Sequence, residues 1–281
     1  LMIFTAINGD LDNFPMPTYS TALSRVIIDY MVNHMMQKSP TINRFQVSHS
    51  NNTLDQLSII NEILCESNLR NSVHRVIMNL GFLPIFSRLF PKWKRYNNVI
   101  FIDTCNSFDE IFSQIKFKSW DFQGNYIIAI TIYNDELYSC MMKLFEAFWS
   151  KHIVNVVVIF MSQAKNEVLL YTYYPFSAFY CERAVPVQLN QYRGNKFLNK
   201  IDYFPEKLSN FYGCPLSVAT FNNPPFLMYH QDEAGAVYVD GIEGILIRLL
   251  TQRLNFNIQL YIAPDAWGYV DRNGNASGKT T

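Results

Sequence analysis

The sequence has few charged residues, and those it has carry no net charge. Of its 281 residues 16% are charged, and 23 basic residues balance 23 acidic ones. Soluble domains average about a quarter charged residues, so we expect part of this surface to be covered in a larger assembly. The balanced charge excludes the overall attraction to phosphate that nucleic-acid-binding proteins show. We therefore expect no nucleic-acid partner.

Long apolar runs and metal-binding patterns are also missing. The longest apolar candidates, such as "HIVNVVVIFM", are strand-sized, well short of the about 20 residues that a membrane-spanning helix needs. None of the five cysteines stands in a CxxC pair, and none of the five histidines is spaced as HxxxH or HExxH. Such spacings hold metals in proteins, so we expect no metal site and no cofactor.

Signatures of catalysis and of nucleotide binding are absent as well. The segment "GNASGKTT" places three residues between its glycines, whereas a phosphate-binding loop needs four. No serine elbow, Cys/His nucleophile pattern or spaced acid pair occurs. The sequence therefore predicts a protein that is not an enzyme.

The cysteines and two sequons point outside the cell. Cys181 and Cys214 flank a long polar stretch and could form a disulfide in an oxidising compartment. Asn51 and Asn275 each begin an Asn-X-Ser/Thr triplet and are candidate glycosylation sites. The other cysteines lie within or beside apolar segments and are predicted to be buried thiols: Cys65, Cys105 and Cys140.

Residues 1–180 alternate between strand and helix patterns. Apolar runs typical of strands lie at 41–47, 73–78, 97–104, 125–133, 154–161 and 167–174. Amphipathic or capped segments typical of helices lie at 21–36, 57–67, 108–115 and 135–152. Strands that alternate with helices favour crossover units and a parallel sheet. We expect an open, largely parallel, Rossmann-like α/β domain here.

A polar segment and a second, smaller unit follow. Residues 181–213 lose the periodicity and are predicted to be a linker or lid. "PLSVATF" then predicts a strand at 215–221, which the prolines in the segment 222–225 end. A helix at 242–254 and an alternating strand at 255–264 complete one parallel crossover. The apolar stripe of this helix consists of Ile242, Ile245, Leu246, Leu249 and Leu250.

A small-molecule site is expected where this strand ends and the helix begins. In crossover units, ligands bind at the carboxyl edge of the sheet, and free N–H groups at a helix start favour an anion. Asn222, Asn223 and Tyr229 are the polar candidates. Gly241 is a further candidate, with close helix–sheet packing as its alternative role. Trp267 is predicted either to wall the pocket or to pack in the core.

Three segments carry a resemblance to a known family. They are "GCPLSVATFNNPPF", "DGIEGILIRLLTQRLNF" and "APDAWGYVDRNGNASG", preceded by "VLLYTYYPF" and "FPEKLSNFYGC". In this order the chain resembles the ionotropic glutamate receptor superfamily, specifically the divergent insect ionotropic receptors of chemosensation. The likeness covers residues from about 125 to 278.

The resemblance implies a domain plan and a function. Residues 1–180 would be an extracellular amino-terminal α/β domain, 181–213 a linker, and 214–281 an incomplete first lobe of a periplasmic-binding-protein-like ligand-binding domain. The chain would be the ligand-sensing part of a chemosensory cation channel subunit, truncated before the pore. Its parent would act at the plasma membrane in a tetramer with co-receptor subunits.

The chain departs from the glutamate-binding members of that family. Those members carry an acidic residue where Asn223 stands, and a ligand-contacting tyrosine where Val239 stands next to Tyr238. The resemblance therefore implies a small chemosensory ligand other than glutamate. A soluble periplasmic-type solute-binding protein, an α/β enzyme with an unrecognised site and an early-ending gene product remain alternatives.

Overall fold

The chain forms two compact units. The first comprises Leu1–Tyr173 and Pro186–Phe204, and the second comprises Tyr174–Val185 and Pro205–Thr281. The computed structural model describes residues 18–34, 41–44, 59, 62–63, 97–102, 108, 123–130, 137–162, 167–231, 233, 237–262, 269–270 and 276–277. None of the helices among these residues is long and apolar enough to cross a membrane.

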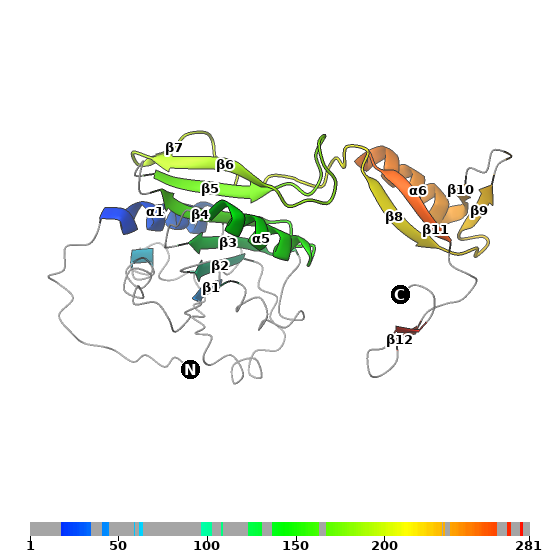
Figure 1. The fold of residues 1–281 in the computed structure, drawn as a ribbon, viewed down its shortest axis with the longest axis horizontal. Coiled ribbons are helices and arrows are strands. Elements are labelled where there is room, and N and C mark those ends of the chain that lie inside the picture. Colours follow the sequence, from blue (N-terminus) through cyan, green and yellow to red (C-terminus); the bar gives the residue numbers. More distant parts are fainter. Residues whose placement is uncertain are drawn as a thin grey trace. The chain divides into compact units, whose positions relative to one another are not determined.

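A seven-stranded mixed sheet organises the first unit, with its strands in sequence order (Figure 1). Strands β1 to β4 run parallel to one another, whereas β5, β6 and β7 each pair antiparallel with the strand before them. The strands are β1 (Thr41–Arg44), β2 (Asn97–Ile102), β3 (Asn125–Ile130), β4 (Val156–Ser162), β5 (Glu167–Tyr173), β6 (Pro186–Arg193) and β7 (Lys196–Phe197).

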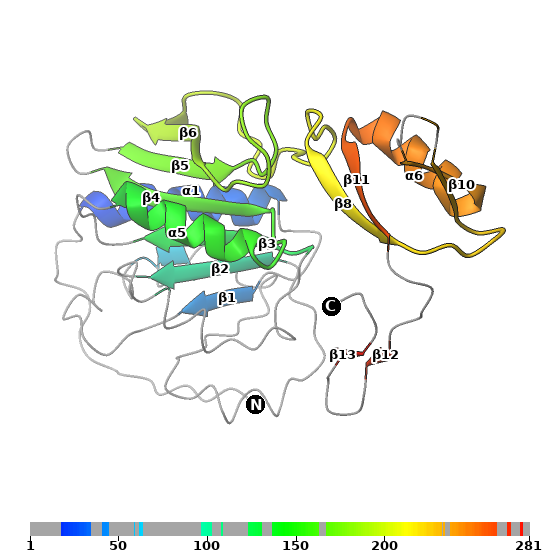
Figure 2. The ribbon, with the colours of Figure 1, turned by 45° about the vertical axis from the view of Figure 1, so that its right-hand side comes forward.

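Two helices lie on opposite faces of this sheet, α5 in front and α1 behind in Figure 2. Each helix buries one apolar stripe, as amphipathic helices on a sheet do. Both predicted stripes are confirmed as buried. Helix α1 (Thr18–His34) buries Leu23, Val26, Ile27, Tyr30 and Met31, and α5 (Leu137–Trp149) buries Leu137, Met141, Leu144, Phe145 and Phe148.

The central strands are buried on both faces. All six residues of β2 and five of the six in β3 are buried, which explains the apolar runs at 99–102 and 126–130. One face of the sheet joins α1 in a core cluster, and Tyr203 closes this cluster from beyond β7. The predicted α/β fold class is confirmed. The parallel part of the sheet is limited to β1–β4.

The antiparallel half of the sheet differs from the sequence prediction. Strand β5 pairs antiparallel with β4, with only four residues between them, too few for a parallel crossover. Strand β6 and the β7 strand lie inside 181–213, the segment predicted as a linker. The turn between them has Gly194 at φ 57° and Asn195 at φ 63°, the conformation of a two-residue type I′ hairpin.

The second unit contains the predicted parallel crossover. Strand β8 (Pro215–Thr220) pairs in parallel with β11 (Asn257–Ile262), and helix α6 (Gly241–Leu254) connects them. Between β8 and α6, the segment predicted as a loop forms an antiparallel hairpin of β9 (Met228–Gln231) and β10 (Val237–Asp240). Two short strands, β12 (Tyr269–Val270) and β13 (Ala276–Ser277), pair near the end.

Other predicted elements fall outside the described residues. This applies to the strand at 73–78 and to most of the helices at 57–67 and 108–115. Within those helices the structure describes Ile59, Glu62, Ile63 and Phe108, each in helical conformation.

Candidate ligand-binding site

The end of β8 is a tight turn whose backbone bonds to itself. The Pro224–Pro225 peptide bond is cis. The Asn223 N–H donates to the carbonyl oxygen of Leu227 at 2.8 Å, and the Asn223 carbonyl accepts from Phe226 and Leu227. Asn222 is exposed and Asn223 is half-buried. The turn therefore leaves both predicted asparagines at least partly exposed at the end of β8. Asn222, Asn223 and Tyr229 are called the rim residues below.

The amino terminus of α6 is closed by that same turn. The N–H of Ile242 donates to the Pro225 carbonyl at 3.4 Å, and the N–H of Glu243 donates to the Phe226 carbonyl at 2.9 Å. The expectation that these N–H groups are free to bind an anion is therefore wrong. The predicted anion site fails because the turn supplies its own acceptors to the helix start.

Gly241 makes this closure possible. Its φ is +83°, and a Cβ atom there would stand 2.6 Å from the carbonyl oxygen of Phe226 and 2.7 Å from that of Pro225. One helical turn later, a Cβ on Gly244 would stand 2.9 Å from the carbonyl carbon of Val239. Both glycines thus allow the helix to approach neighbouring backbone closely.

The β9–β10 hairpin separates the two predicted tyrosines. Tyr229 lies opposite Val239, and His230 lies opposite Tyr238. Because successive strand residues point to opposite faces, Tyr229 and Tyr238 lie on different faces of the hairpin. Val239 is 2% exposed, whereas Tyr229 and Tyr238 are 37% and 51% exposed. The hairpin itself was missed in the sequence, although "MYHQ" and "VYVD" are rich in the aromatic and β-branched residues of strands.

His230 and Tyr238 form an aromatic pair on their face of the hairpin. Their ring centroids are 5.2 Å apart and the planes are inclined by 27°. The remaining candidate residues, Trp267, Asn51 and Asn275, lie outside the described residues.

The predicted apolar stripe of α6 faces away from the described part of its unit. Its five members are 42–64% exposed, and they are Ile242, Ile245, Leu246, Leu249 and Leu250. The predicted stripe therefore lies on one face of the helix, and that face is exposed. Gly244 is buried instead, and Ile247, Thr251 and Leu254 are half-buried along the same line of the helix.

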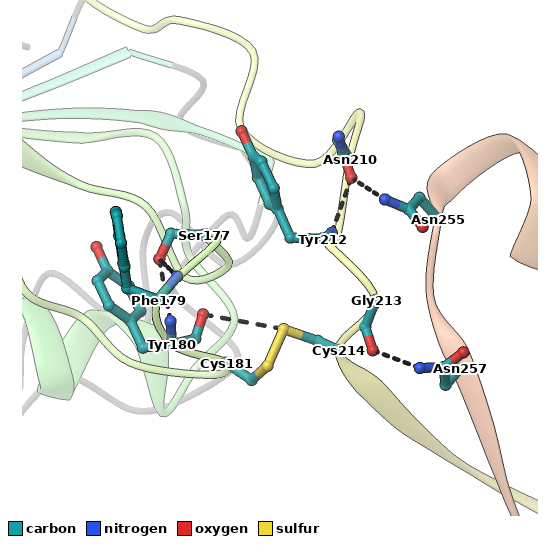
Figure 3. Close-up of a disulfide and its surroundings, with 10 residues drawn as sticks. All are labelled: Ser177, Phe179, Tyr180, Cys181, Asn210, Tyr212, Gly213, Cys214, Asn255 and Asn257. Carbon is teal, nitrogen blue, oxygen red and sulfur yellow. Dashed lines mark hydrogen bonds between the residues drawn. A yellow bond between two sulfur atoms is a disulfide. The ribbon is translucent and has the colours of Figure 1, made fainter.

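A disulfide joins Cys181 to Cys214, the residue just before β8 (Figure 3). It connects the two chain segments that make up the second unit. Cys140 is also disulfide-bonded, so the prediction of a buried thiol at this position is wrong. Disulfides persist in oxidising compartments.

Hydrogen bonds fix the start of β8 against the end of α6 (Figure 3). The Asn210 side-chain oxygen accepts from the Tyr212 N–H at 2.7 Å and from the Asn255 amide at 2.9 Å. The Asn257 amide donates to the Gly213 carbonyl at 2.7 Å. These bonds and the disulfide position the strand that leads to the candidate rim.

The charged groups near the site are few and lie at the surface. Asp240, the N-cap residue of α6, makes an ion pair of 3.4 Å with Arg248, and both side chains are about half exposed. Such surface pairs contribute at most about 1 kcal/mol. Among the described residues, no group of three or more His, Cys, Asp or Glu side chains could hold a metal ion.

The side chains of the rim residues carry amide and hydroxyl groups. A family model described as "Putative ionotropic receptor, ligand binding domain" matches residues 13–210, more than two thirds of the chain. The chain belongs to this family of ionotropic receptor ligand-binding domains. No curated protein matches the chain. The resemblance to ionotropic receptors is thereby confirmed, and the family is one of receptors, not enzymes.

The family match and the predicted site cover different parts of this ionotropic receptor chain. The match spans the sheet of the first unit and ends at residue 210, before β8 begins. The candidate residues from Asn222 to Gly241 all lie beyond it. Membership in this family implies a small-molecule ligand and a multimeric channel. The family model describes residues 13–210 as part of a ligand-binding domain, and most of these residues were predicted to form an amino-terminal domain.

Proposed function

We propose that this chain is the extracellular ligand-sensing portion of a chemosensory ligand-gated cation channel subunit. In such a receptor, closure of a two-lobed domain around its ligand shifts the population towards an open pore. The observation that carries the proposal is the ionotropic receptor match over residues 13–210. The proposal assigns the pore to a longer parent protein at the plasma membrane, assembled as a tetramer with co-receptor subunits.

The domain plan is part of the proposal. Residues 1–180 would form an extracellular amino-terminal domain, 181–213 would connect it to the next, and 214–281 would begin a ligand-binding lobe. The parallel β8–α6–β11 crossover supports the last assignment, because it is the repeating unit of such lobes. Strand β6 supports a shorter connection than 181–213, since it pairs with β5.

Exposed apolar surface in the second unit supports a truncated lobe. Besides the α6 stripe, Tyr261 and Ile262 at the end of β11 are 53% and 43% exposed. Contiguous apolar surface on a soluble protein marks a site of contact with other protein. We infer that further strands of the same lobe cover this surface in the parent receptor.

The rim residues suggest a ligand that is not glutamate. Asn222, Asn223 and Tyr229 provide amide and hydroxyl groups, whereas Tyr238 lies on the other face of the hairpin and Val239 is buried. The N–H groups of Ile242 and Glu243 are already bonded to the turn. A ligand held here would therefore be bound by neutral side chains and not by a helix start.

One experiment tests the receptor assignment. The full-length transcript is sequenced, and the encoded protein is expressed with candidate co-receptors in cells under voltage clamp. We expect membrane-spanning helices downstream and currents in response to small volatile or soluble compounds. A reading frame with a second lobe but no such helices would instead indicate a soluble solute-binding protein.

Site variants test the rim in the same assay. Asn222→Ala and Tyr229→Ala should raise the half-maximal ligand concentration by about tenfold if each removes one polar contact. Tyr212→Phe is the matched control, because Tyr212 is exposed and precedes β8. Unchanged responses in both site variants would remove the rim from the proposal while leaving the receptor assignment intact. Turnover of any small molecule, lost in these variants, would indicate an enzyme.

A further inference from the structure

A cavity of about 520 Å³ lies in the first unit, away from the candidate rim. Its walls come from helix α1, from the helical residue Glu62 and from the β6–β7 hairpin. This volume is in the range of about 300–1,000 Å³ typical of small-molecule sites. All of its lining residues fall within the residues 13–210 that match the receptor family.

The walls carry charges of both signs. Arg25 and Lys196 are positive, Asp29 and Glu62 are negative, and all four line the cavity. A wall of mixed charge around an apolar lining suits a small molecule with an ionised group and a carbon skeleton. The rings of Tyr192 and Phe197, with centroids 5.0 Å apart, supply apolar surface.

Two of the charged groups are held by neighbouring side chains. The Arg25 guanidinium donates to the side-chain oxygen of Asn195, which the hairpin turn positions. Asp29 accepts from the Tyr203 hydroxyl at 3.0 Å and from the Asn33 amide at 2.7 Å. Arg25 and Asp29 are therefore ordered parts of the wall.

Glu62 differs from these two. Its Oε2 atom is buried and has no hydrogen-bond partner within the part of the chain that the structure describes. Buried carboxylate oxygens are nearly always bonded, so one without a partner calls for a physical explanation. The terminal torsion of a glutamate is broad and roughly two-fold, so a rotation of about 180° exchanges its two oxygens.

We propose that this cavity binds a small molecule that carries a protonated amine, with Glu62 as the carboxylate that pairs with the ammonium group. Charge-assisted hydrogen bonds of this kind are stronger than neutral ones, and the pairing would satisfy the unpartnered oxygen. Asp29 lines the same cavity and adds negative potential, while the Tyr192 and Phe197 rings contact the carbon skeleton. The site does not depend on ligand binding at the rim of the second unit.

Two sources could supply the ammonium group, a simple amine or an amino acid. Arg25 and Lys196 would pair with the carboxylate of an amino acid. Three probes that share one ring distinguish the cases: phenethylamine has only the ammonium, phenylacetate only the carboxylate, and phenylalanine has both. The amine proposal requires at least one of phenethylamine and phenylalanine to bind, and phenylacetate to bind more weakly than that probe.

The test is calorimetric titration of the purified full chain with the three probes. Glu62→Gln should weaken the binding of the ammonium probes at least about tenfold, as expected for loss of a charged partner. Glu146→Gln, at an exposed position on α5 and so on the opposite face of the sheet from α1, should leave this binding unchanged.

A second measurement separates a binding role from a structural one. Glu62→Gln should unfold at the same temperature as the wild type or higher, because an unpartnered buried charge has been removed. The proposal is overturned if no ammonium probe binds at millimolar concentration, if phenylacetate binds as tightly, or if Glu62→Gln binds the amines unchanged.

Discussion

Gly241 and Phe226 lie so close that a Cβ atom on residue 241 would stand 2.6 Å from the carbonyl oxygen of Phe226. The contact forms where the turn after β8 meets the start of α6. It explains why the chain has glycine here, because any side chain would push the helix off the turn that caps it. The φ of +83° adds a second reason, since L-residues avoid this region.

Gly241→Ala should therefore destabilise the second unit by about 2–4 kcal/mol, the sum expected for a backbone clash and an unfavourable φ. Gly213→Ala is the matched control, because Gly213 has φ +77° in the same unit and meets only the Asn257 amide at 3.8 Å. It should cost about 1 kcal/mol. Urea denaturation monitored by fluorescence gives both values. Equal losses in the two variants would contradict the close contact.

The disulfide between Cys181 and Cys214 leads to a second prediction. It spans 33 positions of the sequence, and a cross-link of this span stabilises a fold by roughly 3–4 kcal/mol in the chain-entropy model. The double variant Cys181→Ser/Cys214→Ser should lose about that much, because its unfolded chain regains the freedom that the cross-link removes. Replacing both cysteines avoids an unpaired thiol.

Thermal unfolding with and without a reducing agent tests this. Reduction should lower the unfolding temperature of the wild-type chain. The double variant should be less sensitive, with a residual effect from the disulfide at Cys140. A double variant as stable as the wild type would show that the bond adds nothing to the fold.

Tyr203 ties the end of the first unit to helix α1. Its hydroxyl lies 3.0 Å from the Asp29 carboxylate and 3.2 Å from the Val26 carbonyl, and the residue is buried. Burial, followed by the nearby Asp29 charge, raises the pKa of Tyr203 above its usual value. The hydroxyl therefore stays protonated as a donor.

Tyr203→Phe should destabilise the first unit by about 1–3 kcal/mol, because a buried acceptor loses its donor. Tyr212→Phe removes a hydroxyl from an exposed ring and serves as the control, with an expected change below about 0.5 kcal/mol. Chemical denaturation followed by circular dichroism measures both. A Tyr203→Phe variant that matches the control would mean that the hydrogen bond contributes no net stability.

The elements that the sequence predicted well are those whose burial is complete. Strands β2 and β3 contain the continuous apolar runs 99–102 and 126–130 because both faces are covered. Helices α1 and α5 show clear stripes for the same reason. Because each buried position requires an apolar residue, the local pattern of apolar residues is enough to predict these strands and helices.

The elements that were missed depend on long-range pairing or on backbone geometry. Strand β6 is an edge-side strand with alternating exposure and the polar sequence "VQLNQYR", which resembles a loop. The hairpin of β9 and β10 forms by antiparallel backbone pairing between two strands of four residues each. The start of α6 is capped by the backbone carbonyl groups of Pro225 and Phe226. The positions of backbone carbonyl groups cannot be predicted from the types of the side chains.

Lys207 provides a prediction about pH. It is 5% exposed, and its ammonium lies 5.7 Å from the centroid of the Tyr174 ring. Burial lowers the pKa of Lys207 from 10.5 to about 7, since water no longer solvates the charge. The ring contact favours the charged form, but at this distance it is weaker than the loss of hydration.

The sign of the pH dependence follows from where the protons are bound. Between about pH 7 and 10.5 the unfolded chain keeps the lysine proton and the folded chain has released it. Stability therefore rises with pH across this window, and below it both states are protonated and the effect is constant. From pH 7 to 9 the expected gain is about 2 kcal/mol from this residue.

Lys207→Met should remove this dependence and should be more stable than the wild type at pH 7. The difference in unfolding free energy between the two proteins, measured by urea denaturation at pH 6, 7, 8 and 9, should shrink as the pH rises. Taking the difference cancels the groups that titrate equally in both proteins. Lys200→Met, at an exposed position, controls for the loss of one lysine. A difference that stays constant from pH 6 to 9 would show that Lys207 is not deprotonated in the folded chain.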